Sequence, residues 1–417
     1  MRSLFLPLFL LAACHAGGAS GNAAAADSHI DATGAAAPST PVDRAPFAVQ
    51  ELARFDGPWA MAFLPGGAAL VTETAGRLKL WQQGRPTLDV AGVPAVAEVG
   101  QGGLLDVVLS PRFAEDGFVY LTYSEPGPGG SGLALARGRL VPGANDARLD
   151  GVQVIWRDQA RGRGGQFGAI LLFAPDGNSL YLSSGERQRF TPAQDPNQPL
   201  GKILRLTPDG KPAPGNPGAG KTGTPSVVVT DPPRDTEAAK TASGRRVALA
   251  GPNLAPAETW SSGHRNPYGL AFTPDGRLWE TEMGPRGGDE LNLILPGRNY
   301  GWPIVSNGDN YDGVPIPDHP TRPEFAAPKL WWNPSISPTS LLVYSGPLFP
   351  QWQGSGFIGA LSGQALIRVT FHGDTASKAQ QWDMGTRIRF VTQGPDGAIY
   401  LLEDGSPGRL LRLAPKH

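Results

Sequence analysis

The 417-residue sequence contains a single cysteine, which excludes a disulfide framework and any zinc cluster built from cysteines. It has almost no net charge, because 36 Lys and Arg stand against 37 Asp and Glu. A nucleic-acid-binding protein would normally show a basic face or stripe, so we expect no nucleic-acid partner. No segment is apolar enough to cross a bilayer, which takes about 20 apolar residues.

Glycine and proline, by contrast, are abundant. The 56 Gly and 42 Pro make up about 23% of the chain, against an ordinary share of about 12%. Helix interiors tolerate neither residue well, which argues against a mostly helical protein. A hydrophobic content of 40% with ten Trp is too rich for a disordered chain. The composition therefore predicts a large, turn-rich, all-β globular protein.

The N-terminal residues resemble an export signal. Residues 1–13 combine one Arg with a short apolar run and end in small residues before Cys14, in the order Leu-Ala-Ala-Cys. This resembles a bacterial lipobox, which predicts a lipoprotein signal peptide over residues 1–13 and lipidation of Cys14. The alternative is an ordinary secretory signal with an incidental cysteine. Residues 14–45 are rich in Ala, Gly, Ser and Pro, which predicts a flexible tether to a membrane in the bacterial periplasm.

From residue 46 to residue 417 the sequence repeats one unit: a short apolar strand, a turn of the Pro-Asp-Gly type, and a second apolar strand. Examples are residues 167–184, FGAILLFAPDGNSLYLSS, and residues 267–281, PYGLAFTPDGRLWET. Such turns favour Gly because they place it at positive φ. Six such units predict a six-bladed β-propeller of four-stranded antiparallel blades. The alternative, a β-sandwich, lacks so regular a unit.

Residues 211–256 interrupt this repeat and predict a long loop insertion between blades. They contain a match to the phosphate-loop pattern, from Gly215 to Thr222. That pattern binds phosphate only where a strand leads in and a helix follows, and the prolines and glycines around it favour neither. We therefore expect no nucleotide site there.

The densest polar region lies between residues 261 and 302. Asp289 and Glu290 are adjacent in a loop rich in Gly, where carboxylate and backbone carbonyl oxygens suit Ca²⁺. The alternative is a solvated acidic turn that pairs with Arg286. Arg387 and Arg389 stand two residues apart, so that they point the same way from a strand and suit an anionic ligand together with Arg265.

Five motifs occur in a fixed order along the chain: 100–106, GQGGLLD; 263–267, GHRNP; 284–290, GPRGGDE; 299–303, NYGWP; and 386–389, TRIR. With these motifs the chain resembles the soluble quinoprotein aldose sugar dehydrogenases, the glucose/sorbosone dehydrogenase family. The resemblance covers roughly residues 47–415. It implies a six-bladed propeller that binds pyrroloquinoline quinone (PQQ) and Ca²⁺ over its central channel and oxidises the anomeric hydroxyl of an aldose sugar to a lactone.

The resemblance also implies roles for individual residues. The positions that match the cofactor contacts of the family are Gln101, Arg265, Asn266, Arg387 and Arg389. The positions that match its calcium site are Gly284, Pro285, Asp289, Glu290 and Tyr300. Calcium polarises the quinone, and an aldose sugar and an electron acceptor are the partners of the reaction.

The sequence departs from the family at three positions. The catalytic histidine is matched by Gln166, whose amide cannot act as a general base near neutral pH. Glu186 matches the acidic residue that orients this histidine, and it becomes a base itself if burial raises its pKa. Ser362 stands where family members usually have a lysine, and Met283 where they have Gln or His. Of the six histidines, only His264 lies inside a motif.

Three functions remain open from the sequence. The first is a PQQ- and calcium-dependent sugar dehydrogenase with Gln166 and Glu186 at its catalytic positions. The second is a calcium-binding propeller that binds a ligand without turnover. The third is a lactonase-type hydrolase in which calcium activates water, which leaves Arg387 and Arg389 without a role.

Overall fold

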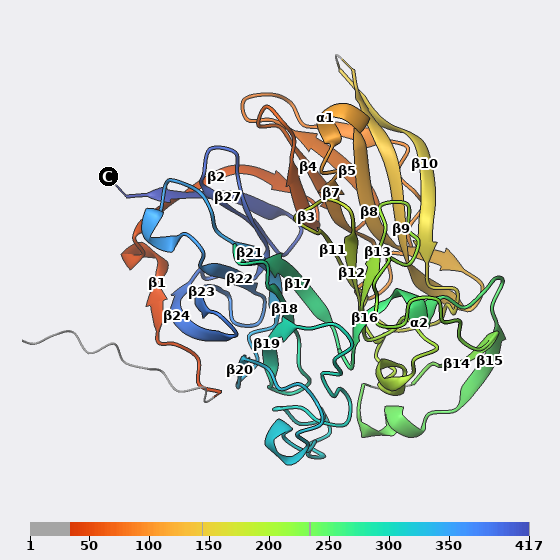
Figure 1. Cartoon of the computed structure of the whole chain (residues 1–417). Coiled ribbons are helices and arrows are strands. Elements are labelled where there is room, and N and C mark those ends of the chain that lie inside the picture. Colours follow the sequence, from red (N-terminus) through yellow and green to blue (C-terminus); the bar gives the residue numbers. More distant parts are fainter. Residues whose placement is uncertain (1–33, 144, 233–234, 417) are drawn as a thin grey trace, which may run out of the picture. The chain divides into compact units, whose positions relative to one another are not determined.

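The computed structural model describes residues 34–143, 145–232 and 235–416, and these residues are almost entirely β-strand (Figure 1). The α-helices of this part are single turns, α1 (Phe113–Asp116) and α2 (Ala255–Glu258). Short 3₁₀ turns cover Val42–Arg44, Thr191–Gln194, Glu237–Thr241, His319–Thr321 and Pro350–Trp352. No helix in the described residues has the length and apolar character that a membrane span requires. The all-β prediction is confirmed.

The strands form sheets that follow one another along the chain, from red-orange to blue in Figure 1. An eight-stranded sheet has the order β3 (Pro58–Phe63), β4 (Ala69–Glu73), β5 (Arg77–Trp81), β6 (Leu88–Ala91), β10 (Ala147–Arg157), β9 (Gly130–Pro142), β8 (Phe118–Gly127), β7 (Leu104–Leu109). Two four-stranded sheets follow: β11 (Gly168–Phe173), β12 (Leu180–Ser184), β13 (Lys202–Leu206), β16 (Thr259–Ser262); and β17 (Pro267–Phe272), β18 (Leu278–Glu282), β19 (Asp289–Ile294), β20 (Leu330–Trp332).

The remaining sheets involve the two ends of the described chain. A five-stranded sheet has the order β1 (Ser39–Pro41), β24 (Thr375–Asp383), β23 (Ala365–His372), β22 (Gly356–Ala360), β21 (Pro338–Val343). The last sheet is β2 (Phe47–Phe55), β27 (Gly408–Pro415), β26 (Ile399–Glu403), β25 (Ile388–Gln393). In it the early strand β2 pairs with the final strand β27, so the sheet joins the start of the repeats to their end (Figure 1).

The first strand of each repeat unit lies on the inside. Strands β3, β7, β11, β17, β21 and β25 each contact the next in this order, and β25 returns to contact β3. Side chains and backbone from all of these strands line one shared cavity. The Pro-Asp-Gly turns then lead outward to the second strands, with Gly177 at φ 70° and Gly276 at φ 83°, the conformation that favours glycine. The inner strands therefore form a closed ring.

The sheets are less uniform than the predicted four-stranded units. β6 and β10, the outermost strands of two neighbouring units, pair in parallel over the short stretches beginning at Val90 and Ala147, which merges the units into the eight-stranded sheet. The five-stranded sheet gains its extra strand from β1, which pairs in parallel with β24. These pairings use strand edges that a repeat pattern does not reveal.

β1 also lies within the residues assigned to the tether. The composition placed the start of the folded part near Pro46, but strand pairing begins at Ser39 and a 3₁₀ turn follows. Ala37 and Ala45 are buried, so this segment packs through small side chains that give little hydrophobic signal in the sequence. Residues 1–13, with the predicted signal peptide, and Cys14 lie outside the described residues.

The insertion at 211–256 carries structure of its own. Its strands β14 (Ser226–Thr230) and β15 (Gly244–Ala248) form a two-stranded hairpin. Val227 and Val229 of this hairpin pack on Ala160. The residues of the phosphate-loop pattern form consecutive turns, and the next element after them is β14. The connection between these two strands places Asp235 at the site described next.

Candidate functional site

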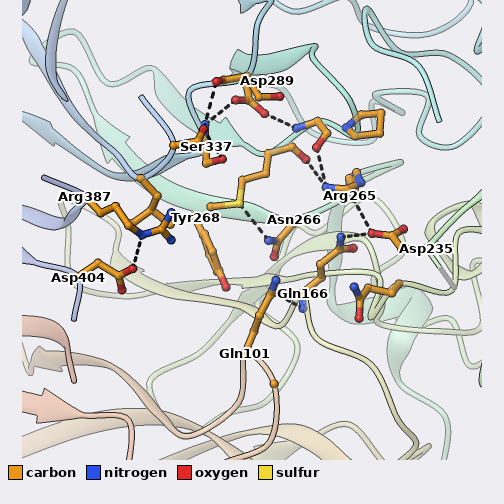
Figure 2. A pocket seen from close by; sticks show the side chains of 18 of the residues that line it. Gln101, Gln166, Asp235, Arg265, Asn266, Tyr268, Asp289, Ser337, Arg387 and Asp404 are labelled. Atoms are coloured by element: carbon orange, nitrogen blue, oxygen red, sulfur yellow. Dashed lines mark hydrogen bonds and ion pairs between the residues drawn. The ribbon is translucent and has the colours of Figure 1, made fainter. Parts of the chain in front are cut away.

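A cavity of about 1150 Å³ is lined by loops that connect the strands of different sheets (Figure 2). Most of the residues singled out from the sequence meet here: Gln101, Gln166, Arg265, Asn266, Gly284, Pro285, Asp289, Arg387 and Arg389. Met283 and Ser362 line it as well. In Figure 2, Arg387 and Asp404 lie on one side of the cavity, and Arg265 and Asp235 lie on the other. Glu186, Glu290 and Tyr300 are not part of its lining.

Gln166 and Gln101 are hydrogen-bonded to each other at one wall of the cavity. The backbone N–H of Gln166 donates to Oε1 of Gln101 at 2.7 Å. The Gln166 side chain is buried, and its Nε2 donates to Oδ2 of Asp235 at 3.1 Å. Its Oε1 is buried without a hydrogen-bond partner. Gln166 also adopts φ 53°, an uncommon conformation for a residue other than glycine, which the surrounding contacts maintain.

Arg265 connects the wall to the loop that begins at Gly284. Its guanidinium is 3% exposed, and Nη1 donates to the backbone oxygens of Gly284 at 2.7 Å and Met283 at 3.2 Å. Nη2 forms an ion pair with Asp235 at 2.9 Å, while Nε is buried without a partner. Burial opposes its charge, but the combined effect of Asp235, Tyr311 and Glu186 outweighs burial and raises the pKa of Arg265. This cation is therefore fixed in place and keeps an unused donor.

Asn266 follows Arg265 and bridges two further segments. Its Oδ1 accepts from the backbone N–H of Gly168, and its Nδ2 donates to Sδ of Met283 at 3.6 Å. A sulfur is a weak acceptor, so the amide of Asn266 retains capacity for a stronger one.

Arg387 and Arg389 project into the cavity from the start of β25, as their spacing predicted. Both bind Asp404: Nε of Arg387 donates to Oδ2 at 2.6 Å, and Nη2 of Arg389 donates to Oδ1 at 2.6 Å. Burial opposes ionisation of Asp404, yet the two arginines hold its pKa below the usual range. The Arg387 side chain is 45% exposed and that of Arg389 only 16%. The three groups together carry one net positive charge.

Asp289 organises the loop from Gly284 to Asp289. Its side chain is 1% exposed, and Oδ1 accepts from the N–H of Gly284 at 2.8 Å. Its Oδ2 accepts from the N–H groups of Ile336 at 2.6 Å and Ser337 at 2.7 Å. Burial raises the pKa of Asp289 to about 6, against the effect of these three donors. The carboxylate thus ties the loop to the segment before β21.

Glu290 and Tyr300 lie at a second, small cavity of about 10 Å³, next to the first, with Gly284 in both linings. This volume admits about one water-sized species. The hydroxyl of Tyr300 donates to the backbone oxygen of Leu293 and accepts from the N–H of Leu295, so it is committed to the chain. The five predicted calcium residues therefore divide between two cavities that share Gly284.

The lining of the small cavity includes Glu282 and Glu290, which form an acidic cluster with Glu280 and Asn292. They share one face of the β18–β19 pair, with Glu282 opposite Glu290 and Glu280 opposite Asn292. Nδ2 of Asn292 lies 3.0–3.2 Å from a carboxylate oxygen of each glutamate. Burial, and then the charge of Glu282, raises the pKa of Glu280 well above its usual value. Buried carboxylates at this density favour a nearby cation.

Two further expectations concern residues outside the large cavity. Glu186 is fully buried, and its Oε2 accepts from the backbone N–H groups of Arg189 and Phe190. Burial, followed by the charge of Asp235, raises its pKa to about 7. His264 is also fully buried, hydrogen-bonded to Ser261 and Glu282. Neither residue lines the cavity, so neither directly contacts a ligand bound there.

The sequence reasoning singled out Glu290 but missed Asp235, Asp404 and the other three members of the acidic cluster, Glu280, Glu282 and Asn292. The alternation of polar residues in Glu280-Thr-Glu282 and Glu290-Leu-Asn292 was a usable signal, because it places them on one strand face. Asp404 and Asp235 are isolated aspartates in loops, and only the fold brings them to arginines far away in the sequence.

Comparison with known proteins identifies the family. Residues 55–246 and 248–412 match the family Glucose / Sorbosone dehydrogenase. The chain belongs to this family. It is 37% identical over 375 residues to the aldose sugar dehydrogenase YliI of Escherichia coli (strain K12), covering 87% of this chain and 91% of the relative.

Solved structures of glucose/sorbosone dehydrogenases agree with this assignment. The apo form of the soluble aldose sugar dehydrogenase from Escherichia coli superposes with a TM-score of 0.75 at 35% identity, over 89% of this chain and 100% of the other. The PQQ-bound aldose sugar dehydrogenase from Streptomyces coelicolor superposes with a TM-score of 0.65 at 26% identity, with the same coverage. The chain thus has the fold of a sugar dehydrogenase family along nearly its whole described length.

Proposed function

We propose that this protein is a PQQ- and calcium-dependent dehydrogenase that oxidises the anomeric hydroxyl of aldose sugars to lactones. The observation that carries the proposal is the large cavity with four arginines in its lining, Arg265, Arg286, Arg387 and Arg389, the first of which keeps a buried, unused donor. PQQ is a tricarboxylate, and arginine is the side chain best suited to planar carboxylates. Membership of the family and the PQQ-bound relative support the same assignment. Sugar-dependent reduction of a dye that requires added PQQ tests it.

The side chains that would hold PQQ are Gln101, Arg265, Asn266, Arg387 and Arg389. The buried, unpartnered Nε of Arg265 and Oε1 of Gln166 fit a polar ligand, because such atoms are costly to leave unpaired. When bound, PQQ supplies the two-electron acceptor for the hydride of the sugar. The chain itself binds and orients the sugar and takes up its proton.

Calcium is assigned to the region around Gly284. At the large cavity, the carbonyl oxygens of Gly284 and Pro285 would be calcium ligands, and Asp289 would maintain the conformation of their loop. Glu290, with Tyr300 beside it, would serve at the small cavity, where the acidic cluster supplies buried negative charge. Oxygen donors of this kind suit a hard cation. Because these residues divide between two cavities, the site supports either one calcium ion near Gly284 or two ions. Calcium titration measures how many ions bind.

The departures from the family pattern lie at this site. The sulfur of Met283 accepts a hydrogen bond from the side-chain amide of Asn266, and Met283 lines both cavities. Met283 therefore orients this proposed PQQ-binding amide without adding charge to the site. Ser362 donates to the backbone oxygen of Ser335 and lies 2.8 Å from Oγ of Ser337. The serine leaves the cavity without the positive charge that a lysine would add, so we expect the arginines to account for most of the attraction for PQQ.

We infer a six-bladed propeller for the architecture. The closed ring of inner strands, the shared cavity along their axis and the β2–β27 pairing support it. Each inner strand is then the first strand of one four-stranded blade. The β6–β10 and β1–β24 pairings are additional to the strand pairings within these blades.

The two arginines at the start of β25, Arg387 just before the strand and Arg389 within it, give the first prediction. Arg389→Gln should weaken PQQ binding about tenfold to a hundredfold, because it removes a mostly buried cation whose hydrogen bonds to charged groups contribute about 1.5–3 kcal/mol each. Arg387→Gln should weaken it less, since solvent screens its half-exposed side chain. PQQ titration of the calcium-loaded variants measures both affinities. Equal affinities in wild type and Arg389→Gln would remove this arginine from the proposed PQQ site.

The second prediction concerns location. We propose that the mature protein is anchored to a membrane in the bacterial periplasm through lipid on Cys14. Expressed from the full sequence in a bacterial host, it should fractionate with membranes and incorporate labelled fatty acid, whereas Cys14→Ser should do neither. Periplasmic release of the wild-type protein without label would instead indicate an ordinary secretory signal.

A further inference from the structure

We propose that Asp235, supplied by the loop insertion, accepts the proton of the sugar hydroxyl in this enzyme. The inference rests on the proposed sugar oxidation and adds to it the residue that performs the proton transfer. Its basis is the position of the Asp235 carboxylate at the cavity wall, with one oxygen held and the other free of protein partners.

The contacts of Asp235 define its orientation. Oδ2 accepts from Nη2 of Arg265 at 2.9 Å and from Nε2 of Gln166 at 3.1 Å. Oδ1 is buried and has no hydrogen-bond partner, although the side chain as a whole is 14% exposed. Figure 2 shows Asp235 beside Arg265 and Gln166 at this wall. Two donors therefore fix one oxygen and leave the other as a lone acceptor.

The other carboxylates that line the cavity are already engaged or exposed. Asp289 accepts three backbone N–H groups, and Asp404 is bound by two arginines. Glu98 is exposed at the rim beside Thr74. Among the described residues that line the cavity there is no histidine. Asp235 is thus the carboxylate of this lining that combines burial with an unused oxygen.

Glu186 is the competing candidate, because its Oε1 is also buried without a hydrogen-bond partner. It lies behind the wall, with Oε2 held by the backbone N–H groups of Arg189 and Phe190, and it is not part of the lining. The charge of Asp235 adds to burial in raising the pKa of Glu186 to about 7. Asp235, paired with Arg265, is the carboxylate of the two that faces the ligand.

The chemistry balances with a single base. Oxidation of the anomeric C–OH breaks its O–H bond and its C–H bond and forms the C=O of the lactone. The proton would pass to Oδ1 of Asp235, and the hydrogen on carbon would leave with its electron pair to the two-electron acceptor that bound PQQ would supply. Arg265 and Gln166 keep Oδ2 in place during the transfer. A base must lie about 2.6–3.2 Å from the proton-bearing atom. Asp235 lines the cavity and its Oδ1 is buried without a partner, so the proposal requires the bound sugar hydroxyl to become the hydrogen-bond partner of Oδ1.

Isosteric variants provide the test. Asp235→Asn keeps the size and an acceptor for Arg265 but removes the base, and Asp235→Glu keeps a carboxylate. Glu237→Gln is the matched control from the same loop, because Glu237 binds Asn310 and Lys240 and does not line the cavity. Glu186→Gln tests the competing candidate. For each protein, loaded with calcium, the PQQ affinity is measured by titration, and kcat and KM for an aldose by dye reduction.

We expect Asp235→Asn to lower kcat by about 10²–10⁴-fold, the typical effect of losing a general base. Its PQQ affinity and KM should stay within about threefold of wild type, Asp235→Glu should keep part of kcat, and Glu237→Gln should match wild type. In a crystal structure with PQQ and sugar, the anomeric oxygen should lie within hydrogen-bond distance of Oδ1.

Three results would overturn the assignment. The first is a kcat for Asp235→Asn within tenfold of wild type. The second is a loss of turnover matched by a loss of PQQ affinity, which would make Asp235 a residue that only positions Arg265. The third is a larger loss in Glu186→Gln than in Asp235→Asn. A wild-type protein that binds no PQQ, or binds it without oxidising sugar, would instead refute the proposed function, and the proton acceptor with it.

Discussion

Asp289→Ala should abolish the calcium-dependent rise in melting temperature and destabilise the protein by about 3 kcal/mol or more. The substitution removes the acceptor of three backbone N–H groups, those of Gly284, Ile336 and Ser337. Each buried donor left unpaired costs about 1–3 kcal/mol. The loop would also lose the link that holds Gly284 and Pro285 in place, so calcium would no longer bind the native state selectively.

Thermal unfolding with added calcium and with chelator measures this effect. Asp312→Ala is the control, because Asp312 is exposed and accepts a single long hydrogen bond from the N–H of Val314. It should keep the wild-type calcium response and nearly the wild-type stability. A calcium response in Asp289→Ala equal to that of wild type would contradict the assignment of calcium to this loop.

Arg265→Met should reduce PQQ affinity by about 100-fold or more, the largest effect that we expect from a single cavity side chain. The guanidinium is 3% exposed and joins Asp235 to the backbone oxygens of Met283 and Gly284. Methionine keeps the apolar stem but leaves Asp235 as a buried charge without its partner, which costs about 3–5 kcal/mol. Both the charge that attracts PQQ and the geometry of the Gly284 loop would be lost.

Titration of PQQ into the calcium-loaded variant, with circular dichroism to establish folding, measures the loss. Arg265→Lys keeps the charge without the planar fork and should fall between the two proteins. Arg322→Met is the control, since the Arg322 side chain is 41% exposed and its contacts are local, an ion pair with Glu324 and the ring of Phe325. If Arg265→Met folds and binds PQQ as tightly as wild type, the arginine has no part in the cofactor site.

Much of the fold was predictable, because each repeat unit has a recognisable local sequence pattern. The Pro-Asp-Gly turns place Gly177 and Gly276 at positive φ, and the apolar runs beside them form paired strands. The β1–β24 and β6–β10 pairings were not predictable. They depend on which strand edges meet after the units are assembled, and short segments such as Ser39–Pro41 carry no strand signal of their own.

The candidate site was also predictable only in part. Arg387 and Arg389 were predicted to share a face from their spacing, and both line the cavity with Arg265. The counter-charge Asp404 was missed, so the predicted receptor appeared more positive than it is. Asp235 was missed because it belongs to none of the recognised motifs, and its contact with Gln166 joins residues 69 positions apart. Glu186 was singled out as a base on the condition that burial raises its pKa; burial does raise its pKa to about 7, but Glu186 is not part of the cavity lining.

The most direct test of the account is a titration of PQQ into the calcium-loaded protein, made without residues 1–13, followed by dye reduction with a panel of aldoses. We predict tight PQQ binding and dye reduction that requires PQQ and sugar together, with lactone as the product. PQQ binding without sugar-dependent dye reduction would instead indicate a ligand-binding protein whose cavity no longer catalyses oxidation. Failure to bind PQQ at all would contradict the central claim that the arginines of this cavity form a quinone site.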